Sequence, residues 1–153
     1  MSQHAPHQGG CLCGAVKLTI DAEPVSSRLC WCRDCQYWAA GSPTFNVLFP
    51  REHVQMTGPV SWYESDAASG NHMRRGFCSK CGTHLISDAD PAPADGLIRV
   101  RAGALDNPEL LPPQAIIWTE HAPSWAQFDP ALPRFERQPP APATAADTAK
   151  KDS

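Results

Sequence analysis

Seven cysteines constrain this chain more than any other feature, because all of them fall into three short clusters. An odd number of thiols cannot all pair as disulfides within one chain. Closely spaced cysteines beside glycine are instead typical of turns that chelate a metal ion. The clusters are Cys11-Leu12-Cys13, Cys30-Trp31-Cys32-Arg33-Asp34-Cys35 and Cys78-Ser79-Lys80-Cys81.

The number of cysteines in each cluster predicts two metal sites of different kinds. The outer clusters together supply four thiolates, which closes a tetrahedral site of the structural zinc type. The middle cluster supplies three, and three protein ligands with one exchangeable position are typical of a catalytic zinc. We therefore expect two Zn²⁺ ions per chain. The expected ligands are Cys11, Cys13, Cys78 and Cys81 for the structural ion and Cys30, Cys32 and Cys35 for the catalytic ion.

Three other interpretations of the middle cluster stay open. In the first, its cysteines are buried, reduced thiols without a metal. In the second, Cys32 and Cys35 form a redox pair, although the long helix that follows such a pair in thioredoxin-type proteins is absent. An iron–sulfur cluster is the third interpretation, and it is weakened because seven cysteines cannot supply two clusters of four thiolates.

The rest of the sequence favours a mainly β fold with little helix. Sixteen prolines are spread along the 153 residues, which argues against long helices and against a helical bundle. Helical signal is limited to residues 33–40 and a turn near 51–54. Alternating apolar and polar residues predict strands. The expected strands are 15–20, 43–49, 61–63, 83–87, 97–100 and 115–118.

Composition also predicts the domain boundaries, the compartment and the partners. We expect a flexible N-terminus at 1–8, one zinc domain at 9–137, and a disordered tail rich in Pro and Ala at 138–153. The sequence shows no secretory signal and no membrane span, which favours the cytoplasm. A net charge of −3 argues against binding to nucleic acid or to an anionic membrane. Nothing in the pattern specifies an oligomeric state.

The ligand type of the middle cluster narrows the chemistry. Three thiolates leave a zinc ion with one net negative charge, and electron-rich sulfur reduces its Lewis acidity. Hydrolysis of peptides or phosphates is therefore disfavoured. A soft, sulfur-rich site instead suits a fourth sulfur from a substrate. The cluster predicts a small thiol as substrate and the formation or cleavage of a carbon–sulfur bond.

The order of these motifs resembles that of the glutathione-dependent formaldehyde-activating enzyme family, which includes the CENP-V-like proteins. The resemblance departs at Trp31 and Ile116, where many relatives have histidine. The matching segments are residues 9–16, residues 30–35 followed by Gly41-Ser42, residues 74–85, residues 100–106 and residues 133–135.

This resemblance implies a Mss4-like fold, in which packed antiparallel sheets are stapled by a Cys₄ zinc site. It implies a structural zinc on the first and third motifs and a catalytic zinc on the second. The founding activity of the family joins formaldehyde to glutathione to give S-hydroxymethylglutathione, and members are classed as carbon–sulfur lyases. Glutathione is therefore the implied thiol substrate.

Three further residues are weaker candidates for substrate contact. Arg74 and Arg75 would clamp a substrate carboxylate, or would be solvated charges at the rim of a strand. Trp31 would form a wall over the open zinc, or would belong to the core. The alternative function is a non-catalytic, zinc-stabilised module that binds a protein. A nucleic-acid or chromatin binder is disfavoured by the acidic charge.

Overall fold

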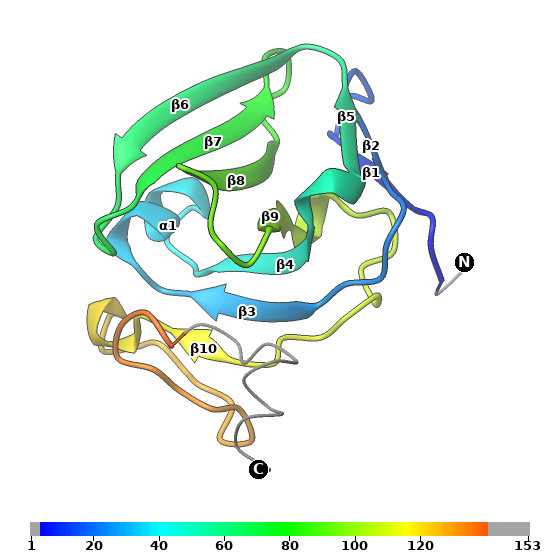
Figure 1. Ribbon diagram of the computed structural model, residues 1–153. Coiled ribbons are helices and arrows are strands. Elements are labelled where there is room, and N and C mark those ends of the chain that lie inside the picture. Colours follow the sequence, from blue (N-terminus) through cyan, green and yellow to red (C-terminus); the bar gives the residue numbers. More distant parts are fainter. Residues whose placement is uncertain (1–3, 141–153) are drawn as a thin grey trace.

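The computed structural model describes residues 4–140 as a large β-sheet packed against a small one. Figure 1 shows the large sheet curving from β10 and β3 below to β6 above, with the small sheet at the right. The strands are β1 (His7–Gly10), β2 (Lys17–Ile20), β3 (Ser26–Cys30), β4 (Thr44–Pro50), β5 (Val54–Thr57), β6 (Val60–Asp66), β7 (His72–Cys78), β8 (His84–Asp90), β9 (Leu97–Arg101) and β10 (Ile116–Ile117).

The two sheets confirm the expected fold class. The small sheet has the order β1-β2-β5, and the large one has the order β10-β3-β4-β9-β8-β7-β6. Every pair of neighbouring strands is antiparallel except β10 and β3, which are parallel. This mainly β arrangement, with cysteine groups able to hold metal, is consistent with a Mss4-like fold.

Helices are few and short. Residues Arg33–Trp38 form α1, which corresponds to the helix expected at 33–40. Three single 3-10 turns follow at η1 (Arg51–His53), η2 (Ala102–Ala104) and η3 (Thr119–His121). No helix within residues 4–140 is long and apolar enough to cross a lipid bilayer.

The hydrophobic core lies between the two sheets and is formed by side chains from one face of each sheet. Successive residues of a strand point to opposite faces of its sheet. In β9, Ile98 and Val100 are therefore buried in the core, whereas Arg99 and Arg101 lie on the other face. Buried core residues from the other strands include Leu18, Ile20, Val47, Phe49, Leu85 and Ile86. The large sheet thus has one apolar face and one face available for polar side chains.

Six strands lie where the sequence predicts them, and four do not appear among the predictions. The four are β1, β3, β5 and β7. In β3 and β7 polar residues lie on both faces of the strand, among them Arg28 and Arg75 on the face opposite to the core. The apolar alternation that reveals a half-buried strand is therefore missing. In β1 two of the four residues are glycine, which is rare in strands.

The folded region begins and ends slightly outside the expected limits. His7 is buried and pairs with Ile20, so the expectation of a flexible N-terminus through residue 8 is wrong for residues 7 and 8. At the other end, Trp118 Nε1 donates a hydrogen bond of 3.2 Å to Gln138 Oε1, so the tail expected from 138 contacts the domain at its first residue. Residues 141–153 of that tail lie outside the described residues. We propose one unit from His7 to Gln138.

Leu18→Ala tests the core between the sheets. Leu18 is fully buried, so this truncation should lower the free energy of unfolding by about 2–5 kcal/mol. Denaturant titration of the variant and of wild type measures the change. Val25→Ala, at a half-exposed position, is the control and should change stability by less than about 0.5 kcal/mol. Equal stability of the two variants would contradict this packing.

Candidate metal centres and active site

The four cysteines of the outer clusters come together at the junction of the two sheets. Cys11 and Cys13 lie between β1 and β2 of the small sheet. In the large sheet, Cys78 is the last residue of β7 and Cys81 lies between β7 and β8. Their four sulfur atoms lie within 4.8 Å of one another. This group of residues therefore connects segments that are 65 residues apart in the sequence.

The spacing of these sulfur atoms fits a tetrahedral ion. Zinc–sulfur bonds of about 2.3 Å place tetrahedral ligands about 3.8 Å apart. The Sγ atoms of Cys11 and Cys13 lie 3.5 Å apart, and those of Cys13 and Cys78 lie 3.8 Å apart. These two spacings match those of a tetrahedral zinc site with four thiolate ligands.

The chelating turns are fixed by glycine and by backbone donors. Gly14 and Gly82 have φ of +82° and +77°, which a residue without Cβ adopts easily. Backbone N–H groups donate to sulfur in both turns, from Val16 to Cys11 at 3.2 Å and from Lys80 to Cys78 at 3.3 Å. Such donors stabilise thiolates and orient them before an ion binds.

The middle cluster forms a second, more buried group of three sulfurs. Cys30 is the last residue of β3, Cys32 caps α1, and Cys35 lies in the first turn of α1. All three are less than one tenth exposed, and their sulfur atoms lie within 4.8 Å of one another. The Cys35 N–H donates to Cys32 Sγ at 3.3 Å, which fixes the turn of this cysteine trio.

The surroundings of the cysteine trio favour one negative charge, since the pKa of Cys35 is lowered while the pKa values of Cys30 and Cys32 are raised. Hydrogen bonds from the Cys30 and Cys32 thiols lower the pKa of Cys35, and the nearby Arg101 guanidinium lowers that pKa further. Arg101 is itself buried, and loss of hydration lowers its pKa to about 10, so it remains a cation near neutral pH. Thiolates beside a buried cation are suited to hold a metal ion.

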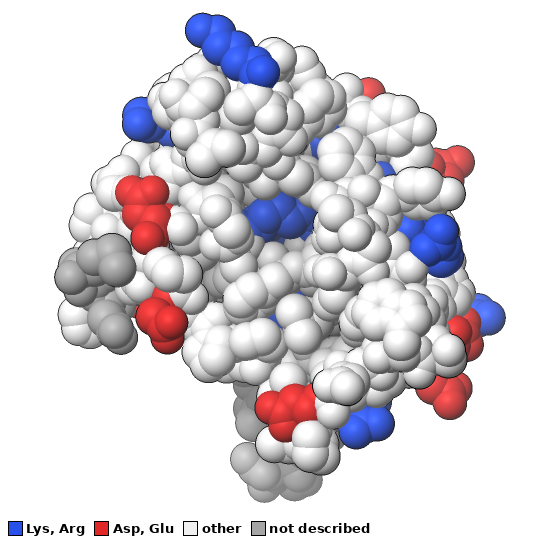
Figure 2. Space-filling view, turned by 180° about the vertical axis from the view of Figure 1, so that it is seen from behind, with Lys and Arg blue, Asp and Glu red and all other residues white. Residues whose placement is uncertain are grey.

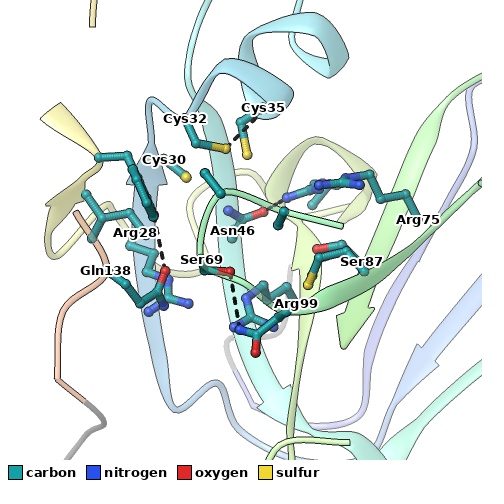
Figure 3. Close-up of a pocket in the computed structure, with 17 residues that line it drawn as sticks. Arg28, Cys30, Cys32, Cys35, Asn46, Ser69, Arg75, Ser87, Arg99 and Gln138 are labelled. Carbon is teal, nitrogen blue, oxygen red and sulfur yellow. Dashed lines mark hydrogen bonds between the residues drawn. The ribbon is translucent and has the colours of Figure 1, made fainter. Parts of the chain in front are cut away.

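A cavity opens beside the cysteine trio on the polar face of the large sheet. Cys30, Cys32 and Cys35 contribute to its lining, together with four arginines: Arg28, Arg75, Arg99 and Arg101. In Figure 3 the cysteines lie at one end, Arg28 and Arg99 lie toward the other, and Asn46 lies between them. Figure 2 shows basic side chains at the bottom of a hollow on the face opposite to Figure 1.

The register of the sheet explains why these arginines converge. Arg28 on β3 pairs with Asn46 on β4, which pairs in turn with Arg101 on β9. In a neighbouring row, Arg99 on β9 pairs with Ser87 on β8, and Ser87 pairs with Arg75 on β7. Directly paired residues project from the same face of a sheet. Arginines that are distant in sequence are thereby placed around one cavity.

Two of the four arginines have strong protein partners. Arg101 donates to Asn46 Oδ1, and its Nε donates to His84 Nδ1 at 3.2 Å. Burial and the charge of Arg101 lower the pKa of His84 to about 3, so its imidazole is neutral and accepts this bond. Arg75 is 3.6 Å from Asp34 and donates to Ser65 Oγ at 2.8 Å. These contacts hold both guanidiniums in place at the cavity.

The structure separates the three weaker candidates for substrate contact. Arg75 lines the cavity, but Arg74 points to the opposite face of β7, where it pairs with Glu64 at 3.6 Å and covers the Trp62 ring. The expectation of a clamp made of both arginines is therefore wrong for Arg74. Adjacent residues of a strand cannot share one face.

Trp31 also does not line the cavity. It is buried against Trp125 and Phe128, with ring centroids 6.0 and 6.3 Å away, so its role is packing. Trp118 forms part of the cavity lining instead.

Sequence reasoning missed several cavity residues for an identifiable reason. Arg28, Asn46, Arg99 and Ser87 belong to no compact motif. A signal was present in β9, where Arg99 and Arg101 alternate with Ile98 and Val100. That alternation reveals one polar face, but it does not reveal which other strands contribute to it. Only the pairing of β3, β4, β8 and β9 shows this.

Comparisons with known proteins provide independent observations. The sequence matches the family model described as glutathione-dependent formaldehyde-activating enzyme over residues 6–121. The fold is similar to the crystal structure of a Rhodobacter sphaeroides protein from a structural genomics programme, with a TM-score of 0.52 and 19% identity. The match covers 67% of this chain and 92% of that chain, and at this identity it bears on the fold alone. No curated protein matches the sequence significantly.

Two cysteine substitutions test the assignment of separate metal centres. Cys78→Ser should remove about one ion per chain and lower the unfolding temperature strongly, because this ion would link the two sheets. Cys32→Ser should also remove about one ion, with a much smaller effect on unfolding. Metal content by mass spectrometry and thermal unfolding by circular dichroism measure both effects. Retention of two ions by either variant would contradict the assignment of that cluster.

Proposed function

Because the chain belongs to the glutathione-dependent formaldehyde-activating enzyme family, we propose that it adds a small thiol such as glutathione to formaldehyde, or reverses that addition. The reaction takes place in the cavity beside Cys30, Cys32 and Cys35. The observation that carries this proposal is a buried trio of sulfurs at the end of a cavity lined by arginine. The activity is that of a carbon–sulfur lyase.

The proposal includes two zinc ions per chain. Cys11, Cys13, Cys78 and Cys81 would hold a structural ion, and Cys30, Cys32 and Cys35 would hold the ion of the active site. An ion held by three thiolates supplies a position at which a substrate thiol can ionise. The burial and close spacing of the cysteine trio, and the arginine beside it, support this choice of ligand set.

The reaction requires no oxidant or reductant. A bond forms between the thiol sulfur and the carbonyl carbon while the S–H bond breaks. The carbon–oxygen double bond becomes a single bond, and the thiol proton ends on the new hydroxyl oxygen. Arg75 and Arg101 both line this cavity, and guanidinium N–H groups are suited to stabilise negative charge developing on that oxygen. The walls of the cavity hold the two reactants together and limit the access of water.

The alternative of a non-catalytic module that binds a protein is less well supported. Such a module gives no reason to bury guanidinium groups beside three thiols. The family model that matches the sequence is named for an enzyme. We also infer that the protein works in a reducing compartment, such as the cytoplasm, because its seven cysteines are free thiols suited to binding metal.

The exchange of formaldehyde with glutathione tests this function. Purified protein should accelerate formation of S-hydroxymethylglutathione, followed by NMR with ¹³C-formaldehyde. Cys35→Ser should lower the acceleration by at least about 100-fold, because it removes a ligand of the active site. Arg74→Gln, on the opposite face of β7, is the matched control and should retain the wild-type rate. Acceleration that survives in Cys35→Ser would place the chemistry elsewhere.

A further inference from the structure

Two arginines of the cavity differ from Arg75 and Arg101 in having no side-chain hydrogen-bond or ion-pair partner within residues 4–140. Arg28 and Arg99 are half-buried, and neither forms an ion pair with any carboxylate within residues 4–140. The Nε of Arg28 is buried and has no hydrogen-bond partner in this part of the chain. Buried polar groups nearly always find a partner, so each exception calls for an explanation.

Arg28 on β3 and Arg99 on β9 line the same cavity from either side of β4, and their like charges act unfavourably on each other. Asp95 attracts both groups, but its Oδ1 accepts the N–H of Leu97, and it lies outside ion-pair distance of either arginine. The fold therefore maintains two like charges at one cavity, and no carboxylate within residues 4–140 forms an ion pair with either of them.

Other arginines of this protein show what a structural role requires. Arg75 pairs with Asp34, Arg51 pairs with Asp88, and Arg101 is held by Asn46 and His84. Packing alone does not require a second pair of cations on the same face. Two guanidiniums without an ion-pair partner that line a cavity are instead suited to bind a carboxylate from outside the protein.

We propose that Arg28 and Arg99 form an anion-binding subsite for a carboxylate carried by the substrate. This rests on the proposed function and specifies its substrate class. The cysteine trio marks one end of the cavity and the two arginines lie toward the other, so one molecule reaches from sulfur to carboxylate (Figure 3). Formaldehyde carries no charge and makes no use of such a subsite.

The carboxylate has two possible sources, which matched probes distinguish. An acidic thiol is represented by 3-mercaptopropionate, with 2-mercaptoethanol as its neutral counterpart. An acidic carbonyl compound is represented by glyoxylate, with acetaldehyde as its neutral counterpart. Isothermal titration of the purified, metal-loaded protein measures the affinity for each of the four probes. At least one acid should bind ten or more times as tightly as its counterpart, and the pair that shows the difference identifies the source.

Substitutions then test whether Arg28 and Arg99 cause the tighter binding of the acidic probe. Arg28→Met and Arg99→Met should each reduce the preference to less than twofold, whereas Arg28→Lys should retain part of it. Arg74→Met removes the same charge from the opposite face of β7 and should leave the preference unchanged. Wild type without a preference for either acid, or a preference that survives both Met variants, would overturn the proposal.

Thermal unfolding distinguishes a binding role from a structural one. Replacing a buried charge without a partner by an apolar side chain is often neutral or stabilising. Arg28→Met should therefore unfold, without ligand, at a temperature equal to or above that of wild type. A clearly lower temperature would assign Arg28 to the structure and would overturn the proposal.

The experiments can reject the anion-binding subsite and the proposed function independently of each other. A preference for acid without acceleration of the formaldehyde–glutathione reaction would leave the subsite in place and reject that activity. Acceleration without any preference for acid would keep the activity and reject the subsite. Binding and turnover are measured separately, so each result bears on one of the two statements.

Discussion

The two-residue alternation of the large sheet is the constraint on which the rest of the structure depends. One face of β4 and β9 packs against the small sheet through Val47, Phe49, Ile98 and Val100. The same alternation turns Asn46, Arg99 and Arg101 to the opposite face. Apolar packing on one side therefore fixes the position of the polar groups on the other, because the backbone cannot shift by one residue without exposing the core.

The two cysteine groups contribute to this architecture in different ways. The outer four lie in turns at the ends of strands from both sheets, so an ion at that point would join the sheets. The cysteine trio lies where β3 leads into α1, beside the polar face of the large sheet. One group is placed to hold the fold together, and the other is placed to face a cavity.

Electrostatics connects the cysteine trio to the arginines. Thiolates buried together repel one another, and the nearby cation of Arg101 offsets part of that repulsion. Arg101 keeps its own position through Asn46 and neutral His84, neither of which cancels its charge. The positive charge of the cavity therefore remains available to an anionic ligand.

The sequence by itself determined that this is a mainly β protein of one family, and that its cysteines form one set of four and one set of three. Both conclusions are local, because chelating turns and alternating strands are written in residues only a few positions apart. Only the tertiary structure decided which side chains surround the cysteine trio. Strand pairing brought Arg28, Arg75 and Arg99 to one cavity, turned Arg74 away, and buried Trp31 against Phe128. The register between distant strands is set by packing of the whole core, and no short segment of the sequence encodes it.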